Sequence, residues 1–194
     1  MRPFWRACAL ASALLALVGA PAFAERADQR EDPALRAALA EAVAEAESFE
    51  HRFDAEVWLM DMAQRLRPRM PDREDRLRLL RLVHAEAKRA DVPPELVLAV
   101  IEVESGFERF AISSAGARGL MQVMPFWLDE LGRPEDNLFD IATNLRYGCT
   151  ILAHYLDVAD GQWYPALARY NGSFGQAWYP DRVFAALEAR WYAQ

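Results

Sequence analysis

An apolar segment that ends on a carboxylate constrains this chain more than any other feature. Residues 96–106 read Leu-Val-Leu-Ala-Val-Ile-Glu-Val-Glu-Ser-Gly. The i, i+3, i+4 and i+7 positions of one helical face are Val97, Val100, Ile101 and Glu104. This spacing predicts a buried helix whose last turn carries an acid on its buried side. A glutamate on an apolar face has to be paired, protonated or used in chemistry. Glu102 is predicted to point away from this face and is left without a role.

The predicted helix has clear signals at both ends. Pro94 stands in its first turn, where a missing N–H costs nothing, and Gly106 is a left-handed stop. Glu104 therefore lies at the negative end of the helix dipole and on an apolar face. Both surroundings disfavour the carboxylate and are expected to raise the pKa of Glu104, as a general acid near neutral pH requires. The structural alternative is that Glu104 pairs with an arginine such as Arg109 or Arg118.

Helical periodicity continues on both sides, so we expect a mainly α-helical protein. Caps, prolines and apolar stripes predict helices over residues 33–48, 54–67, 72–90, 94–105, 141–159, 163–170 and from 179 onward, with another ending near residue 131. The 33–48 helix has only a thin apolar stripe; a docked helix is favoured over a loosely held arm. Small residues and two glycines predict an irregular loop or a small β excursion around residues 110–123.

The first residues have the pattern of a cleaved export signal. Arg2 and Arg6 precede an apolar run over residues 8–19, and Ala22-Phe23-Ala24 is a small-residue cleavage site. The run is short for a transmembrane span, so stable membrane insertion after cleavage is not expected. An uncleaved N-terminal anchor is the alternative. Three parts are expected: a signal peptide over 1–24, a helical extension over 25–70 and a main domain over 71–194.

Charge and cysteine content argue against several other classes. The formal net charge is −7 and the 22 basic residues are scattered, which suits neither nucleic acid nor an anionic membrane. Cys149 is the only cysteine after the expected signal, so it is interpreted as a small buried apolar residue. The three histidines match no metal-ligand spacing, and the sequence contains no calcium loop or Gly-rich phosphate loop. We therefore expect neither a metal nor a cofactor.

Four motifs, in this order, resemble one enzyme family. They are Glu104-Ser105, then Gly116-Ala117-Arg118-Gly119-Leu120-Met121-Gln122-Val123-Met124-Pro125, then Asn144 with Gly148, then Ala168-Arg169-Tyr170-Asn171-Gly172. Together they resemble the catalytic domain of the soluble lytic transglycosylases, lysozyme-like enzymes related to goose-type lysozymes. The resemblance covers roughly residues 77–183 and leaves the helices before residue 70 unexplained. It implies a mainly α, α+β lysozyme-like fold.

This resemblance implies that the substrate is the glycan strand of peptidoglycan. The bond cleaved is the β-1,4 bond between N-acetylmuramic acid (MurNAc) and N-acetylglucosamine (GlcNAc), and the product has a 1,6-anhydroMurNAc end. Glu104 matches the family's single catalytic acid. The positions that match substrate-binding residues are Ser105, Ser113, Gly119, Gln122, Met124, Tyr170 and Asn171. The implied location is the periplasm of a Gram-negative envelope; no protein partner is implied.

The chain offers one convincing catalytic acid, whereas most glycosidases use two carboxylates, so the role of the second carboxylate has to be taken by another group. Protonated Glu104 would donate its proton to the glycosidic oxygen, and the substrate's 2-acetamido group would stabilise the centre at C1. Ionised Glu104 would then take the proton of the C6 hydroxyl as that oxygen attacks C1. Gln122 and Tyr170 would orient the sugar or polarise the acetamido group. For both residues, framework hydrogen bonding is the alternative.

The chain departs from the family pattern at one motif. The family's usual Tyr-Asn-Ala-Gly reads Tyr170-Asn171-Gly172-Ser173, and Arg169 stands where the family often has alanine. These changes concern substrate preference more than chemistry. Two rival functions stay open: a lysozyme-type hydrolase (muramidase), in which water replaces the C6 hydroxyl, and a peptidoglycan-binding or assembly component with vestigial activity.

Overall fold

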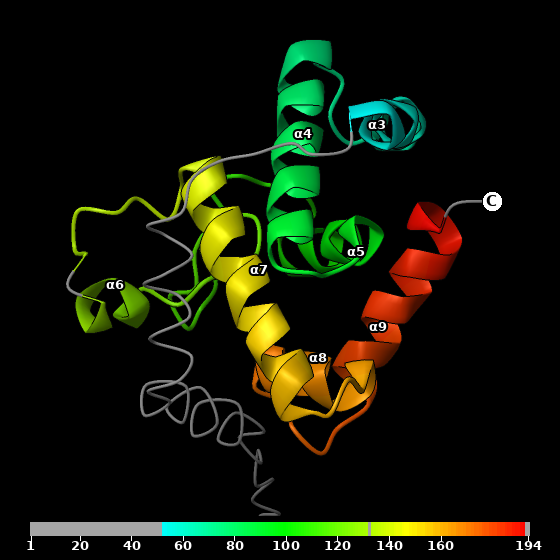
Figure 1. Cartoon of the computed structure of the whole chain (residues 1–194). Helices are drawn as coiled ribbons and strands as arrows, with labels where there is room; N and C mark the ends of the chain where they lie inside the picture. The colour runs from blue at the N-terminus through cyan, green and yellow to red at the C-terminus, as the bar shows by residue number, and fades with distance from the viewer. Residues whose placement is uncertain (1–51, 132, 193–194) are drawn as a thin grey trace, which may run out of the picture.

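Helices dominate the computed structural model, which describes residues 52–131 and 133–192, with side chains from Trp58 onward (Figure 1). Their bounds are α3 (Arg52–Leu66), α4 (Arg73–Arg89), α5 (Pro94–Ser105), α6 (Phe126–Glu130), α7 (Ile141–Val158), α8 (Trp163–Asn171) and α9 (Trp178–Ala186), followed by the π-helical turn η2 (Leu187–Trp191). The expected signal peptide and the expected 33–48 helix lie outside the described residues. Within the described part, no helix is long and apolar enough to cross a membrane.

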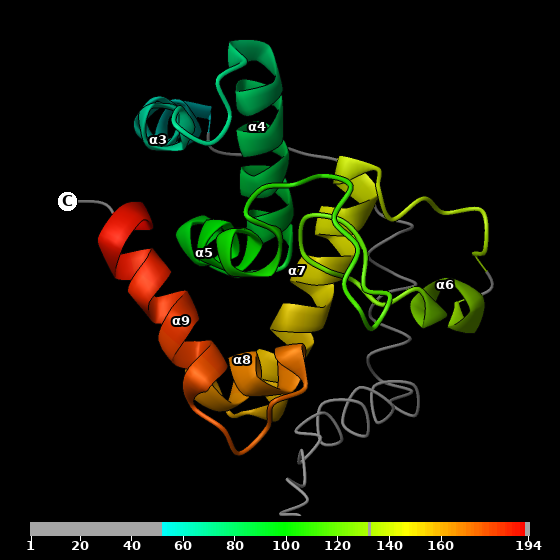
Figure 2. The same ribbon diagram turned by 180° about the vertical axis from the view of Figure 1, so that it is seen from behind.

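Helix α5 lies at the centre of this arrangement, as its apolar sequence predicts. It sits between α7 and α9 in two opposite views (Figures 1 and 2), and α4, α9 and η2 pack against it. Every residue from Leu96 to Ile101 is buried, and each large apolar side chain so buried contributes about 1.5–3 kcal/mol. Gly106 ends the helix with φ +60°, and its N–H donates to the carbonyl of Glu102.

Carboxylate caps start two helices where the sequence predicts them. Asp72 accepts a hydrogen bond from the amide of Asp75, and Asp140 from the amide of Thr143, each at 2.9 Å. Each cap is worth about 1 kcal/mol. The prediction that Asp54 caps α3 is wrong, because Asp54 lies inside this helix, which already includes Arg52, the first described residue. An acid suits the first turn of a helix as well as its cap position, so sequence alone does not separate the two positions.

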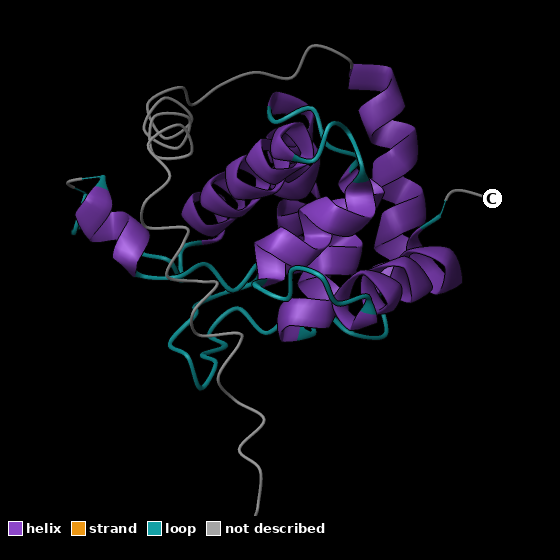
Figure 3. Cartoon of the chain, turned by 90° about the horizontal axis from the view of Figure 1, so that it is seen from below, coloured by secondary structure: helices purple, strands orange, loops and turns teal. Residues whose placement is uncertain are grey.

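The segment 110–123 is a loop with a small β component. Two isolated antiparallel bridges join Ile112 to Arg118 and Arg118 to Val123. Figure 3 shows the surrounding chain as loop, with no strand drawn among the described residues. The expected fold class, mainly α with a small β excursion in this region, is confirmed.

An ionic cluster on Glu102 ties α5 to distant parts of the chain. The carboxylate accepts from Arg69 Nη2 at 2.6 Å, from Arg190 Nε at 2.7 Å and from the indole Nε1 of Trp191 at 2.8 Å. Glu102 points away from the Glu104 face, as predicted, and it has a structural role that the sequence analysis did not assign: it holds η2 and the segment after α3 against α5. The indole of Trp58, on α3, also donates to the carboxylate of Glu95, on α5, at 2.7 Å. Met62 and Leu66 of α3 are buried in the hydrophobic core, so α3 packs as part of the same domain.

Candidate functional site

Glu104 lies on the last turn of α5 and is hydrogen-bonded by a residue of α9. The hydroxyl of Tyr179 donates to Glu104 Oε1 at 2.8 Å. Glu104 is half-buried, whereas Tyr179 is buried with 1 % of its surface exposed. A buried phenol therefore holds a partly accessible carboxyl in one orientation. Tyr179 is absent from the predicted site residues, because it is 75 positions away and its local pattern marks only the start of α9.

Neither arginine expected as a structural partner of Glu104 pairs with it. The Nε of Arg109 donates to the carbonyl of Phe139 at 2.8 Å. The guanidinium of Arg118 lies over the ring of Phe139, 6.0 Å from its centroid. The alternative in which Glu104 forms an ion pair with Arg109 or Arg118 is therefore wrong.

Ser105 connects the end of α5 to the loop that follows. Its hydroxyl lies 2.8 Å from the carbonyl oxygen of Leu120 and 3.1 Å from that of Ile101, so it donates its proton to one of the two. The first contact spans 15 residues. Ser105 thus fixes the loop beside Glu104.

The loop is further held by its own polar side chains. Ser113 Oγ accepts from the amide of Ala117 at 3.1 Å. Gln122 has a left-handed backbone (φ +51°), and its side-chain nitrogen donates to the carbonyls of Gly119 at 2.9 Å and Ala111 at 3.2 Å. Because both partners are acceptors, the amide nitrogen has to face them, and Oε1 of this half-buried side chain is left on the other side.

Gly119 is required for packing of the loop against α7. A Cβ at Gly119 would clash with the side-chain amide of Asn144 and lie 2.5 Å from the carbonyl oxygen of Leu138, and the backbone φ of +76° already favours glycine. Asn144 is buried and uses its whole side chain: Nδ2 donates to the carbonyls of Arg118 and Leu138, both at 2.9 Å, and Oδ1 accepts from the amide of Met121 at 2.8 Å. The space left by the missing side chain of Gly119 is thus occupied by the protein's own atoms, those of Asn144 and Leu138.

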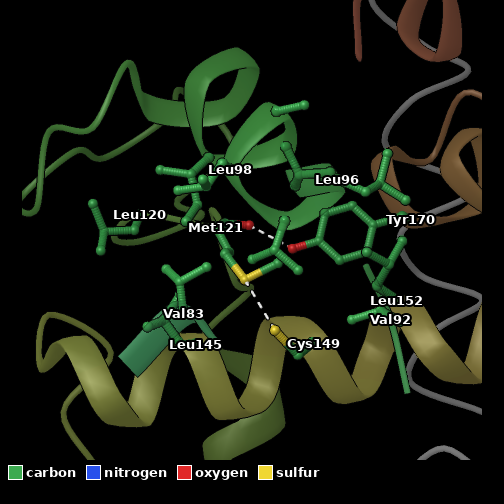
Figure 4. Close-up of a cluster of buried hydrophobic side chains, with 14 of the residues drawn as sticks. Val83, Val92, Leu96, Leu98, Leu120, Met121, Leu145, Cys149, Leu152 and Tyr170 are labelled. Carbon is green, nitrogen blue, oxygen red and sulfur yellow. Dashed lines mark hydrogen bonds between the residues drawn. The ribbon is translucent and has the colours of Figure 1, made fainter. Parts of the chain in front are cut away.

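Tyr170 reaches the same loop from α8 (Figure 4). It is buried, and its hydroxyl donates to the carbonyl oxygen of Met121 at 2.7 Å. Asn171 is the half-buried last residue of α8, and Gly172 follows with φ +79°. Met124 is also half-buried, at the end of the loop. Ser105, Asn144 and Tyr170 therefore converge on residues 118–121 from three different helices.

The remaining titratable groups near this region have structural surroundings. Cys149 is fully buried on α7 beside Met121 (Figure 4), and burial raises the pKa of its thiol; its interpretation as a small apolar residue is confirmed. Burial and a hydrogen bond to Asp136 raise the pKa of Tyr147. In residues 52–131 and 133–192, no three His, Cys, Asp or Glu side chains gather in a geometry that could hold a metal ion.

This arrangement can transfer a proton at one defined point. A single carboxyl, oriented by a phenol, stands at the edge of a loop whose backbone is fixed by three helices. Such a group can give a proton to a ligand oxygen and take one back without help from a second acid. Gln122 and Met124 belong to this loop or follow it directly, Asn171 follows the loop-binding Tyr170 in sequence, and all three side chains are half-buried.

Comparison with known proteins places this site inside one recognised domain. The family model for the transglycosylase SLT domain matches residues 81–188. The membrane-bound lytic murein transglycosylase C of Shigella sonnei is 32 % identical over 112 residues, which are 50 % of this chain and 31 % of that protein. The transglycosylase of Enterobacteria phage PRD1 is 33 % identical over 108 residues, 52 % of this chain and 40 % of that protein.

A shorter match is closer in sequence. The membrane-bound lytic murein transglycosylase C of Actinobacillus pleuropneumoniae (serotype 5b) is 52 % identical over 46 residues, 24 % of this chain and 13 % of that protein. The chain thus spans between 13 % and 40 % of the length of these three relatives.

Proposed function

Because the chain belongs to the family of transglycosylase SLT domains, we propose that it is a peptidoglycan lytic transglycosylase. It cleaves the β-1,4 bond between MurNAc and GlcNAc without consuming water and leaves a 1,6-anhydroMurNAc end. The relatives named lytic murein transglycosylases support this substrate and reaction.

The observation that carries the proposal is the carboxyl of Glu104, oriented by Tyr179 at the end of a buried helix. In the first step protonated Glu104 gives its proton to the glycosidic oxygen, and the bond from that oxygen to C1 of MurNAc breaks. GlcNAc leaves as an alcohol, and the 2-acetamido group of MurNAc supports the electron-poor C1. The hydroxyl of Tyr179 keeps the carboxyl in line for this transfer.

In the second step the same carboxyl acts as a base. Ionised Glu104 takes the proton of the C6 hydroxyl of MurNAc while that oxygen bonds to C1, which closes the 1,6-anhydro ring. The proton lost in the first step is recovered, so the enzyme returns to its starting state. One carboxyl is therefore sufficient, in contrast to glycosidases that need an acid and a separate base or nucleophile.

The substrate-binding residues divide into two groups by their surroundings. Gln122, Met124 and Asn171 are half-buried and line the glycan site; the Oε1 of Gln122 accepts from a sugar N–H or O–H. Ser105, Ser113, Gly119 and Tyr170 act by fixing the loop, since their polar groups or their missing side chains serve the loop's own packing.

The location that fits this function is the periplasm of a Gram-negative envelope. The basic start, apolar run and small-residue cleavage site of residues 1–24 support export. The names of the bacterial relatives, which mention both a membrane and murein, support an envelope location.

Digestion of purified sacculi tests the proposal. The wild type is expected to release anhydro-ended muropeptides, identified by mass. Glu104→Gln is expected to release none while its far-UV circular dichroism is unchanged. Glu108→Gln, an exposed acid four residues later, is the control and is expected to behave as the wild type.

Three outcomes would contradict the proposal. Clearing of sacculi by Glu104→Gln at the wild-type rate would remove Glu104 from the chemistry. Products of the wild type that are heavier by one water would identify a hydrolase. Binding of the wild type to sacculi without any release would identify a binding component with vestigial activity.

A further inference from the structure

A surface patch of aromatic and arginine side chains lies beside the candidate site. It consists of Arg109, Phe110, Ile112, Arg118 and Phe139. The rings of Phe110 and Phe139 pack with centroids 5.9 Å apart. Phe110 is 69 % exposed and Ile112 is 64 % exposed, although both are large apolar residues. Several large apolar side chains gathered at one exposed place indicate a binding surface rather than the scattered exposure of an ordinary surface.

The two arginines of this aromatic–arginine patch are oriented, and within residues 52–131 and 133–192 neither has a carboxylate partner. The guanidinium of Arg109 lies 5.1 Å from the ring centroid of Phe110 and is fixed by its bond to the carbonyl of Phe139. Arg118 stands over the ring of Phe139. Neither forms an ion pair with any residue in the described part of the chain, whereas other arginines of this acidic protein do, such as Arg146 with Glu86 and Arg190 with Glu102.

The patch is continuous with the candidate site. Ala111, between the exposed Phe110 and Ile112, accepts hydrogen bonds at its carbonyl from the amide of Gly119 at 3.0 Å and from the side chain of Gln122 at 3.2 Å. A ligand that occupies the glycan site near Gln122 therefore passes within reach of the patch.

We propose that the aromatic–arginine patch binds the peptide stem of peptidoglycan. This inference rests on the proposed function. The stem is joined to the lactyl group of MurNAc through its amino end, so its far end carries a free carboxylate. Planar guanidinium groups held by aromatic rings match carboxylates in geometry and charge, and the rings and Ile112 offer contact to the aliphatic carbons of the stem. In stem-bearing glycan the lactyl carboxyl of MurNAc is tied up in the amide bond to the stem, so the sugars themselves present no anion to the two cations, which favours the stem over a further stretch of glycan.

A comparison of two substrates tests this assignment. One is a soluble glycan strand with its stems, and the other is the same strand after an amidase has removed them, which leaves only the lactyl carboxylate on each MurNAc. The measured quantity is the ratio of kcat/KM for stem-bearing to stem-free glycan, from anhydro-ended products counted by mass spectrometry. The double variant Arg109→Gln/Arg118→Gln is expected to lower this ratio by about tenfold. Each of the two ionic contacts with the stem changes affinity by about threefold, and the two factors multiply.

Two further measurements sharpen the test. Arg78→Gln, an exposed arginine on α4, is the control and is expected to keep the wild-type ratio. Higher salt is expected to lower the ratio of the wild type and to leave that of the double variant nearly constant, because salt screens exposed ion pairs. The double variant Arg109→Lys/Arg118→Lys is expected to recover part of the ratio, since the charge returns without the planar fork.

The outcomes separate this proposal from the function beneath it. An unchanged ratio in the double glutamine variant, or an equal loss on both substrates, would overturn stem recognition by the patch while the transglycosylase reaction stands. Absence of anhydro products from the wild type on either substrate would instead overturn the proposed function.

Discussion

The hydrogen bond from Tyr179 to Glu104 makes a specific prediction about catalysis. Tyr179→Phe removes only the hydroxyl that orients the candidate acid and keeps the buried ring. The ring is 1 % exposed and its hydroxyl stands 2.8 Å from Oε1, so the substitution removes a well-formed contact without opening a large cavity. We expect an enzyme that folds normally and turns over slowly.

The size of the loss follows from the surroundings of the bond. A neutral hydrogen bond is worth about 0.5–1.5 kcal/mol and one to a charged group about 1.5–3 kcal/mol; because the half-buried Glu104 is protonated in the first step and ionised in the second, we take about 1–2 kcal/mol for this bond. This converts to a decrease of about 5- to 30-fold. Because the bond fixes the acid rather than the substrate, the decrease is expected in kcat, with KM changed little.

The assay is steady-state release of anhydro-ended products from soluble glycan, together with thermal unfolding. Tyr164→Phe is the matched control, because its hydroxyl also donates to a carboxylate, Asp181 at 3.0 Å, but on the exposed surface of α8. It is expected to retain wild-type kcat. Wild-type kcat in Tyr179→Phe would refute the orienting role. A lower kcat that is matched by an equally lowered fraction of folded enzyme would show that the hydroxyl serves stability alone.

Three predictions concern the scaffold. Gly119→Ala is expected to lower the free energy of unfolding by about 2–4 kcal/mol and Tm by about 6–12 °C, because it adds left-handed backbone strain and a clash with α7. Gly116→Ala is the control: its φ is +86° but the space around it is open, so it adds only the strain. Equal Tm values for the two variants would contradict this prediction. Cys149 is expected to react with a thiol reagent only at the rate of unfolding, and rapid labelling of the native protein would contradict its burial. Burial and nearby Lys88 lower the pKa of His84 below its ordinary value of 6.5. Folding therefore favours the neutral ring, and His84 contributes its full stabilisation above about pH 6.5. This contribution is lost as the pH falls through the pKa of His84 in the folded protein. The difference in unfolding free energy between wild type and His84→Gln should therefore narrow from pH 7 to pH 5, and a constant difference would contradict it.

Local patterns predicted the helices because each helix carries its own signals. The apolar face of α5 and its glycine stop specify that element without reference to the rest of the chain. The same holds for the aspartate caps of α4 and α7. The position of Glu104 at the end of a buried stripe follows from periodicity alone.

The contacts that complete the site were beyond local patterns, because they join residues far apart in sequence. Tyr179 reaches Glu104 across 75 positions, and Arg190 reaches Glu102 across 88. Periodicity places Glu102 on the far side of α5, but only the packing of η2 shows that this side is covered. The tight packing around Gly119 likewise depends on Asn144, which lies on α7.

The measurement that tests the central claim most directly is digestion of sacculi in water enriched in oxygen-18. If the C6 hydroxyl activated by Glu104 attacks C1, the new 1,6-anhydroMurNAc ends carry no heavy oxygen, and Glu104→Gln yields no such ends. If each new reducing end carries one heavy oxygen, water is the nucleophile, and the protein is a hydrolase rather than a lytic transglycosylase.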